Sequence, residues 1–171
     1  MRTPYLIDRE FEYQLLKKLV GEMHKKFPGV NASNSVILNV SPDYSSMVSM
    51  YMAHQLSDDG EMCPMMHVDV PYPDQYVHSY KFTFEREMKN TPIYYDNYIL
   101  CEAGVIRGSN YTWITQVLRE YIPKESKIIT LAMCENSGSN FKSDIVGHYY
   151  DDQTQDLTLY FETYNKHWDK K

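Results

Sequence analysis

Residues 98–112 read Tyr98-Ile99-Leu100-Cys101-Glu102-Ala103-Gly104-Val105-Ile106-Arg107-Gly108-Ser109-Asn110-Tyr111-Thr112. The stretch opens on a continuous apolar run, which is typical of a strand buried on both faces. Gly104 and Gly108 bracket a tight loop, and Ser109 or Asn110 is placed to cap a helix over 110–121. The stretch therefore predicts a strand, a glycine-bearing loop and a helix N-terminus in direct succession.

A helix that begins after such a loop favours an anionic ligand. The N–H groups of its first turn have no intrahelical partners, and the helix dipole favours negative charge there. Arg107 adds a guanidinium, whose geometry matches a phosphate. Glu102 stands at the end of the strand, where a carboxylate can hold ribose hydroxyls or a hydrated metal. An ordinary strand-to-helix turn is the alternative interpretation of this pattern.

The same strand–helix alternation recurs in the rest of the chain. An amphipathic helix is predicted over 8–27, with Asp8 as its N-cap and Pro28-Gly29 at its end. The other segments that the pattern predicts are strands at 35–40, 65–70 and 127–134, a turn-rich loop at 41–46 and a helix at 47–56. These repeated units predict an α/β fold with a mostly parallel sheet flanked by helices.

Residues 71–97 interrupt the alternation. Aromatic and polar residues alternate over 77–84, which predicts an irregular excursion or hairpin, and loops of this length are often lids. A short edge strand is predicted at 144–150 and an alternating strand at 157–161. We expect a single domain over 1–171, with a small irregular hood formed by about 71–97 and 145–171.

The composition limits the classes of function. The chain has 171 residues, 43% of them apolar, which is enough for one domain with a sizeable core. Its net charge is −6 and it has no basic run, which argues against nucleic-acid binding or an anionic membrane surface. The sequence has no signal-like segment, no apolar stretch of membrane length and no Cys-x-x-Cys pair. This pattern predicts a soluble cytoplasmic protein with reduced thiols.

The order of these segments resembles the type I phosphoribosyltransferase family. That family's signature is an apolar strand, two adjacent acids, and a loop of the form Val-x-Asp-Thr-Gly-x-Thr that opens a helix. The resemblance implies that Glu102 binds the ribose of phosphoribosyl pyrophosphate, with Mg²⁺ as the cofactor. The residues placed at the 5′-phosphate are Arg107, Gly108, Ser109, Asn110 and Tyr111.

Other segments fit the same order. The loop Ser41-Pro42-Asp43-Tyr44-Ser45 resembles the family's pyrophosphate loop, and the excursion at 71–97 falls where the family carries its flexible catalytic loop. Ile145 and Val146 resemble the segment that contacts the base through backbone groups. The resemblance covers about residues 30 to 162. It also implies a phosphorylated ribose or nucleotide as the ligand, and a homodimer.

The loop departs from the family signature at three positions. The second acid is Ala103, the loop aspartate is Ile106, and the loop threonine is Arg107. One carboxylate clamps ribose and metal more weakly than two, and Ile106 cannot transfer a proton, so we assign no catalytic residue. Two functions remain: a divergent phosphoribosyltransferase acting on a nucleobase or similar acceptor, or a non-catalytic nucleotide- or partner-binding protein on the same fold.

Metal and thiol chemistry have weaker support. His67 and Asp69, with His54 and His78, are candidates for a metal site, although scattered histidines are more often structural. We therefore assign no direct protein ligand to a metal. A cysteine nucleophile is also disfavoured, because Cys101 lies in an apolar strand and has no evident partner base.

Overall fold

A parallel sheet organises the protein. The computed structural model describes residues 2–40, 42–57, 61–68 and 94–159, and in these ranges five strands pair in the order β3-β2-β4-β5-β6. Every pairing in this sheet is parallel. The strands are β2 Ser35–Val40, β3 Met65–Val68, β4 Asn97–Val105, β5 Lys127–Asn136 and β6 Ile145–Tyr150. The predicted α/β fold with a parallel sheet is confirmed.

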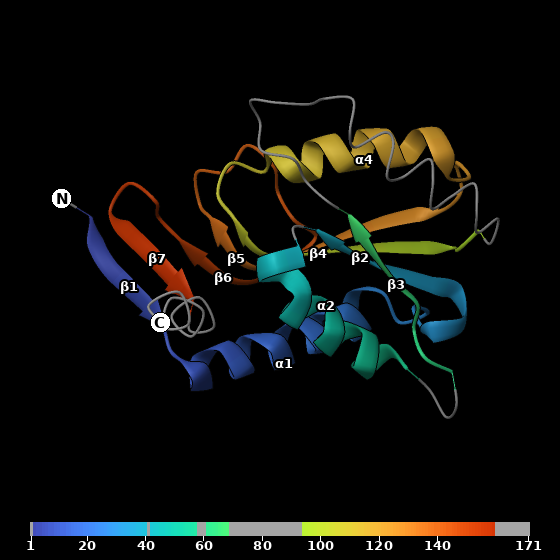
Figure 1. Ribbon diagram of the computed structural model, residues 1–171, viewed down its shortest axis with the longest axis horizontal. Helices are drawn as coiled ribbons and strands as arrows, with labels where there is room; N and C mark the ends of the chain where they lie inside the picture. The colour runs from blue at the N-terminus through green and yellow to red at the C-terminus, as the bar shows by residue number, and fades with distance from the viewer. Residues whose placement is uncertain (1, 41, 58–60, 69–93, 160–171) are drawn as a thin grey trace, which may run out of the picture.

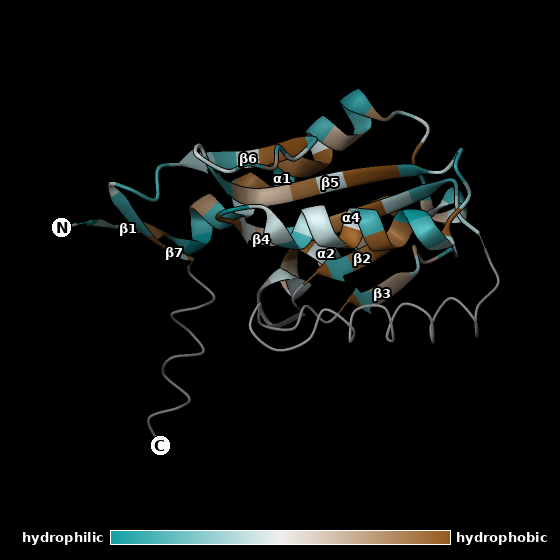
Figure 2. Ribbon diagram, turned by 90° about the horizontal axis from the view of Figure 1, so that it is seen from above, coloured by the Kyte–Doolittle hydropathy of each residue, from teal (hydrophilic) through white to brown (hydrophobic). Residues whose placement is uncertain are grey.

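Helices cover both faces of the sheet. Figure 1 shows α4 (Ser109–Tyr121) on one face, and α1 (Arg9–Lys26) and α2 (Pro42–Leu56) on the other. Side chains alternate between the faces along each strand, so each face carries its own core. On β2, Ile37 packs with the core beneath α1 and α2, whereas Leu38 packs with the core beneath α4. Figure 2 shows most of β5 as hydrophobic, as expected for a strand buried on both faces.

The first predicted helix is confirmed as α1. Asp8 is its N-cap, and the Asp8 carboxylate accepts a hydrogen bond from Phe11 N at 2.8 Å. The apolar stripe of the helix is buried at Leu15, Leu19 and Met23. No helix within the described ranges has the length and apolar character that a membrane crossing requires.

The structure corrects the start of the second helix. The sequence predicted a turn-rich loop over 41–46, but α2 already begins at Pro42. Proline is well suited to the first helical position, because its fixed φ is helical and its missing N–H would have no partner there. Ser41 lies outside the described residues, so only the part of the loop prediction from Pro42 onward is tested, and that part is wrong.

The structure also lengthens two predicted strands. Strand β4 continues through Gly104 to Val105, so Gly104 belongs to the strand and not to the loop. Strand β5 runs two residues beyond its predicted end, to Asn136. The extension of β5 brings the Asn136 side chain next to the loop that follows β4.

A second, two-stranded sheet stands at the end of the main one. Strand β1 (Thr3–Ile7) pairs in parallel with β7 (Gln155–Leu159), and both lie to one side of the main sheet in Figure 1. The sequence did not predict β1. Strand β6 pairs with β5 in the main sheet, so placing residues 145–150 in the hood was wrong. The hood of the described protein consists of β1, β7 and the turn before β7. Most of the excursion at 71–97, together with residues 160–171, lies outside the described residues.

Candidate functional site

Glu102 occupies the C-terminal part of β4, where β5 borders it. Its backbone pairs with Ala132 of β5, and its side chain is 7% exposed. Burial raises the pKa of the Glu102 carboxyl to about 7, and a hydrogen bond from Asn110 opposes this rise. The Asn110 Nδ2 to Glu102 Oε1 distance is 2.8 Å. Near neutral pH this carboxyl therefore exchanges between its protonated and ionised forms.

The loop between β4 and α4 depends on one glycine. Gly108 is the N-cap of α4, has a φ of 77° and makes no side-chain capping bond, so the prediction of Ser109 or Asn110 as the cap was wrong. A Cβ at Gly108 would lie 2.2 Å from Phe141 Cβ, so a larger residue has neither the backbone conformation nor the space. Asn136 Nδ2 fixes the other side of the loop by donating to the Ile106 carbonyl oxygen at 3.1 Å.

A cavity of about 480 Å³ opens beside this loop. We call it the loop cavity; Glu102, Gly104 and the continuous segment 105–110 line it. Four of the predicted phosphate-binding residues are in this lining: Arg107, Gly108, Ser109 and Asn110. Tyr111 is placed differently. Its buried hydroxyl donates to the carbonyl oxygens of Leu100 and Leu131 in the sheet.

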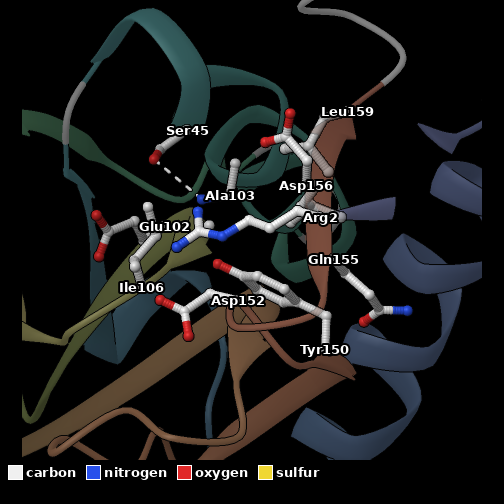
Figure 3. A pocket seen from close by; sticks show the side chains of 12 residues that line it. Arg2, Ser45, Glu102, Ala103, Ile106, Tyr150, Asp152, Gln155, Asp156 and Leu159 are labelled. Carbon is white, nitrogen blue, oxygen red and sulfur yellow. Dashed lines mark hydrogen bonds between the residues drawn. The ribbon is translucent and has the colours of Figure 1, made fainter. Parts of the chain in front are cut away.

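A second cavity of about 320 Å³ lies between the end of β4 and the hood. We call it the hood cavity, and Figure 3 shows the side chains that line it. Strand β4 and its loop contribute Glu102, Ala103, Gly104 and Ile106, and α2 contributes Ser45. The remaining lining residues are Arg2, Tyr150, Asp152, Gln155, Asp156, Leu157 and Leu159.

The two cavities adjoin each other. Glu102, Gly104 and Ile106 line both of them. The charges differ between the two ends, because Arg107 lines the loop cavity, whereas the hood cavity has Asp152 and Asp156 in its lining against one cation, Arg2. One elongated ligand can therefore meet a cationic helix N-terminus at one end and carboxylates at the other.

The Tyr150 hydroxyl is influenced by charged side chains of the hood cavity. Burial, and after it the nearby Asp152, raise the pKa of this hydroxyl to about 12, while Arg2 opposes the rise. In Figure 3 the Arg2 side chain extends across the cavity toward the side that carries Glu102 and Ile106. The phenol of Tyr150 therefore stays protonated at neutral pH and is available as a hydrogen-bond donor.

The segment predicted as a pyrophosphate loop contributes one side chain to the cavities. Residues 42–45 form the start of α2, and Ser45 lines the hood cavity. The buried Ser45 hydroxyl accepts a hydrogen bond from Ala103 N at 3.1 Å, which ties α2 to β4. The predicted base-contacting residues, Ile145 and Val146, lie in β6 and line neither cavity.

Sequence reasoning missed the hood side of the site. Arg2, Tyr150, Asp152 and Asp156 were not proposed as site residues, yet all four line the hood cavity. No local motif marks them, because they come from separate parts of the chain: Arg2 precedes β1, Tyr150 ends β6, and the two aspartates lie in β7 or in the turn before it. One sequence signal for this side of the site was available: two consecutive acids, at 151–152, follow a strand that ends near the sheet's C-terminal edge.

The alternative chemistries gain no support from the geometry. Among the described residues, no group of three or more His, Cys, Asp or Glu side chains is arranged to hold a metal. His67 Nδ1 lies 3.1 Å from Asn39 Nδ2, and Asp69 and His78 are outside the described residues. Burial raises the pKa of the Cys101 thiol to about 12, which leaves it un-ionised at neutral pH and a poor nucleophile.

Comparison with solved structures identifies the fold. The chain superposes on a purine phosphoribosyltransferase from Pyrococcus horikoshii with a TM-score of 0.66 and 10% identity, covering 92% of this chain and 93% of that one. For the xanthine-guanine-hypoxanthine phosphoribosyltransferase of Helicobacter pylori the TM-score is 0.66 and the identity 12%, over 99% and 100% of the chains. For a hypoxanthine-guanine-xanthine phosphoribosyltransferase the TM-score is 0.55 and the identity 11%, over 82% of this chain and 76% of that one.

These likenesses define the fold of the protein. It has the type I phosphoribosyltransferase fold, as the resemblance in the sequence implied. No protein-family model and no curated protein matches the sequence. Because the sequence identities are 10–12%, the superpositions bear on the architecture and leave the activity to be argued from the site.

Proposed function

We propose that the protein is a divergent phosphoribosyltransferase that transfers ribose 5-phosphate from phosphoribosyl pyrophosphate to a nucleobase or similar acceptor. The observation that carries the proposal is the position of Glu102, which lines both adjoining cavities at the end of β4. A sugar at Glu102 would direct its 5′-phosphate into the loop cavity and its anomeric carbon toward the hood cavity.

The loop cavity has the chemistry that a phosphate needs. It is bounded by the start of α4, whose first intrahelical bond runs from Thr112 N to the Gly108 carbonyl oxygen. The N–H groups before Thr112 therefore have no partner within the helix and are available to an anion. The exposed Arg107 adds a guanidinium that suits phosphate oxygens.

Glu102 is the residue that would hold ribose hydroxyls. It would also be the protein contact of Mg²⁺, since it is the one carboxylate among the described residues that lines both cavities. A single carboxylate fits this cation, because Mg²⁺ keeps several waters and takes its other ligands from substrate phosphates. When bound, the cation neutralises charge on the diphosphate leaving group.

The site favours a reaction without a protein nucleophile. The bond from the anomeric carbon to the diphosphate oxygen breaks, and its electron pair leaves with the diphosphate. A bond from that carbon to an acceptor nitrogen forms, and the proton of that nitrogen passes to water. The chain's contribution is to bind and orient the two reactants and to place charge around them. Ile106, which is 54% exposed beside both cavities, has no proton to exchange with the acceptor.

The alternative is a non-catalytic nucleotide- or partner-binding protein on the same fold. It is favoured by Ala103, which is fully buried and has its N–H bonded to Ser45, at the position of the family's second acid. With Ile106 in place of the loop aspartate, a ligand could be held without being turned over.

Release of pyrophosphate from phosphoribosyl pyrophosphate separates the two functions. The assay uses a panel of purine and pyrimidine bases with Mg²⁺, and release that depends on a base supports the transferase. Absence of release with every base, alongside measurable nucleotide binding, rejects the transferase and favours the binding protein. A cytoplasmic location and a homodimer remain predictions from the sequence.

A further inference from the structure

The two adjoining cavities differ in the charge of the side chains that line them. The loop cavity combines Arg107 with the N-terminus of α4. The hood cavity has Asp152, Asp156 and the shared Glu102 in its lining, against the single guanidinium of Arg2. A ligand anchored by its phosphate in the loop cavity therefore presents its other end to an excess of carboxylates.

Several of these carboxylate oxygens accept no hydrogen bond from the described residues. Glu102 Oε1 accepts from Asn110, and Asp152 Oδ1 accepts from Gln153 Nε2 at 3.2 Å. In the part of the chain that the structure describes, no donor bonds Glu102 Oε2, Asp152 Oδ2 or the Asp156 carboxylate. Glu102 is 7% exposed, so a ligand in the cavity that donates to its second oxygen would replace the little contact with water that this side chain has.

The rest of the hood cavity suits a flat apolar ring. Ile106, Leu157 and Leu159 give it aliphatic walls, and Tyr150 gives it an aromatic one (Figure 3). Its volume of about 320 Å³ is at the small end for ligand pockets, which fits one heterocycle. Carboxylates at the edge of such a pocket accept hydrogen bonds from N–H groups and repel carbonyl and carboxylate oxygens.

We propose that the hood cavity selects an amino-bearing heterocycle, such as adenine or cytosine, over analogues with a carbonyl oxygen in place of the amino group. Asp152 is the specificity-determining residue, because it is half-buried, lines the cavity and belongs to the hood. The inference rests on the proposed function, since the phosphate anchor in the loop cavity is what directs the heterocycle under the hood.

Matched nucleotides test the proposal without requiring turnover. AMP and IMP differ by one amino group against one carbonyl, as do CMP and UMP. We expect AMP to bind about tenfold more tightly than IMP, and CMP about tenfold more tightly than UMP, in isothermal titration calorimetry. Ribose 5-phosphate, which lacks a base, reports on the phosphate anchor alone.

The variant Asp152→Asn keeps the shape of the side chain but lets it donate to a carbonyl. It should bring the AMP and IMP affinities to within about twofold of each other, because the new amide serves either ligand. The matched control is Asp96→Asn, which makes the same change at an exposed residue just before the opposite end of β4. The control should keep the wild-type preference.

The outcomes separate the two proposals. If ribose 5-phosphate binds but IMP and UMP bind as well as AMP and CMP, the selectivity is refuted and the phosphate anchor stands. A preference for the amino-bearing ligands that survives Asp152→Asn also refutes the assignment. If neither ribose 5-phosphate nor any of the four nucleotides binds, the proposed function fails together with this inference.

Discussion

The side-chain amide of Asn110 donates a 2.8 Å hydrogen bond to Glu102 Oε1, which joins the first turn of α4 to the end of β4. The two residues face the same loop cavity. Because this hydrogen bond lowers the pKa of Glu102, a ligand that draws Asn110 away would raise it. Occupancy of the phosphate end is thereby coupled to protonation of the carboxyl proposed to hold the ribose.

Replacing Glu102 by glutamine should remove a pH dependence of stability. Burial raises its pKa from 4.5 to about 7, so between these values the folded state binds more protons than the unfolded state, and the free energy of unfolding falls as pH rises. The fall attributable to Glu102 is at most about 3 kcal/mol. Urea denaturation from about pH 5 to about pH 8 should show the free energy of unfolding of E102Q increasing relative to that of the wild-type protein as pH rises.

A matched control for this experiment is Glu125→Gln, at an exposed residue of the turn before β5. It removes the same charge without removing a buried carboxyl. An E102Q profile that runs parallel to that of the wild type across the whole range would contradict the raised pKa.

Removing the Asn110 amide should shift the titration of Glu102 upward. In Asn110→Ala the carboxyl keeps its burial but loses the bond that favours its ionised form. The ¹³C resonance of the Glu102 carboxyl should titrate with a midpoint above about 7. Ser109→Ala is the control, because Ser109 is the exposed neighbour in the same helical turn. An unchanged midpoint in Asn110→Ala would show that the hydrogen bond is not maintained in solution.

The chain should tolerate a methyl group at Gly104, near the end of β4, but not at Gly108, in the loop that follows. An added Cβ at Gly108 meets Phe141 Cβ at 2.2 Å and forces a φ of 77° on an alanine. The cost should be about 1–3 kcal/mol or more in the free energy of unfolding. Nothing lies within 4 Å of a Cβ at Gly104, so Gly104→Ala should change stability by less than about 1 kcal/mol. Equal effects in the two variants would mean that the loop is not held as described.

Arg107→Ala should weaken the binding of phosphorylated ligands without affecting the fold. Arg107 is exposed and lines the loop cavity, and a hydrogen bond to a charged group contributes about 1.5–3 kcal/mol, which corresponds to a loss of at least about tenfold in affinity for ribose 5-phosphate. Lys124→Ala, at an exposed cation beyond the other end of α4, should bind like the wild-type protein. Wild-type affinity in Arg107→Ala would mean that the phosphate lies elsewhere.

Local patterns were sufficient for most of the main sheet and its helices. Asp8 predicts the start of α1 because its carboxylate caps the helix within three residues. Pro42 was misinterpreted because proline is common both in turns and at the first position of a helix, and sequence spacing alone does not separate the two. Gly108 was expected in the loop, but the lack of space for any side chain there comes from Phe141, a residue far along the chain.

Local residue patterns were enough to predict the parallel sheet, the strand–loop–helix around residues 98–112 and the place of Glu102 at the end of its strand. Apolar runs and capping residues act over a few positions, so they can be read without the fold. The pairing of β1 with β7, and the cavity that Arg2, Asp152 and Glu102 line together, are seen only in the folded protein. Strand pairing between residues 3 and 155 depends on long-range contacts that leave no local signature, so the hood side of the site emerges only in the folded chain.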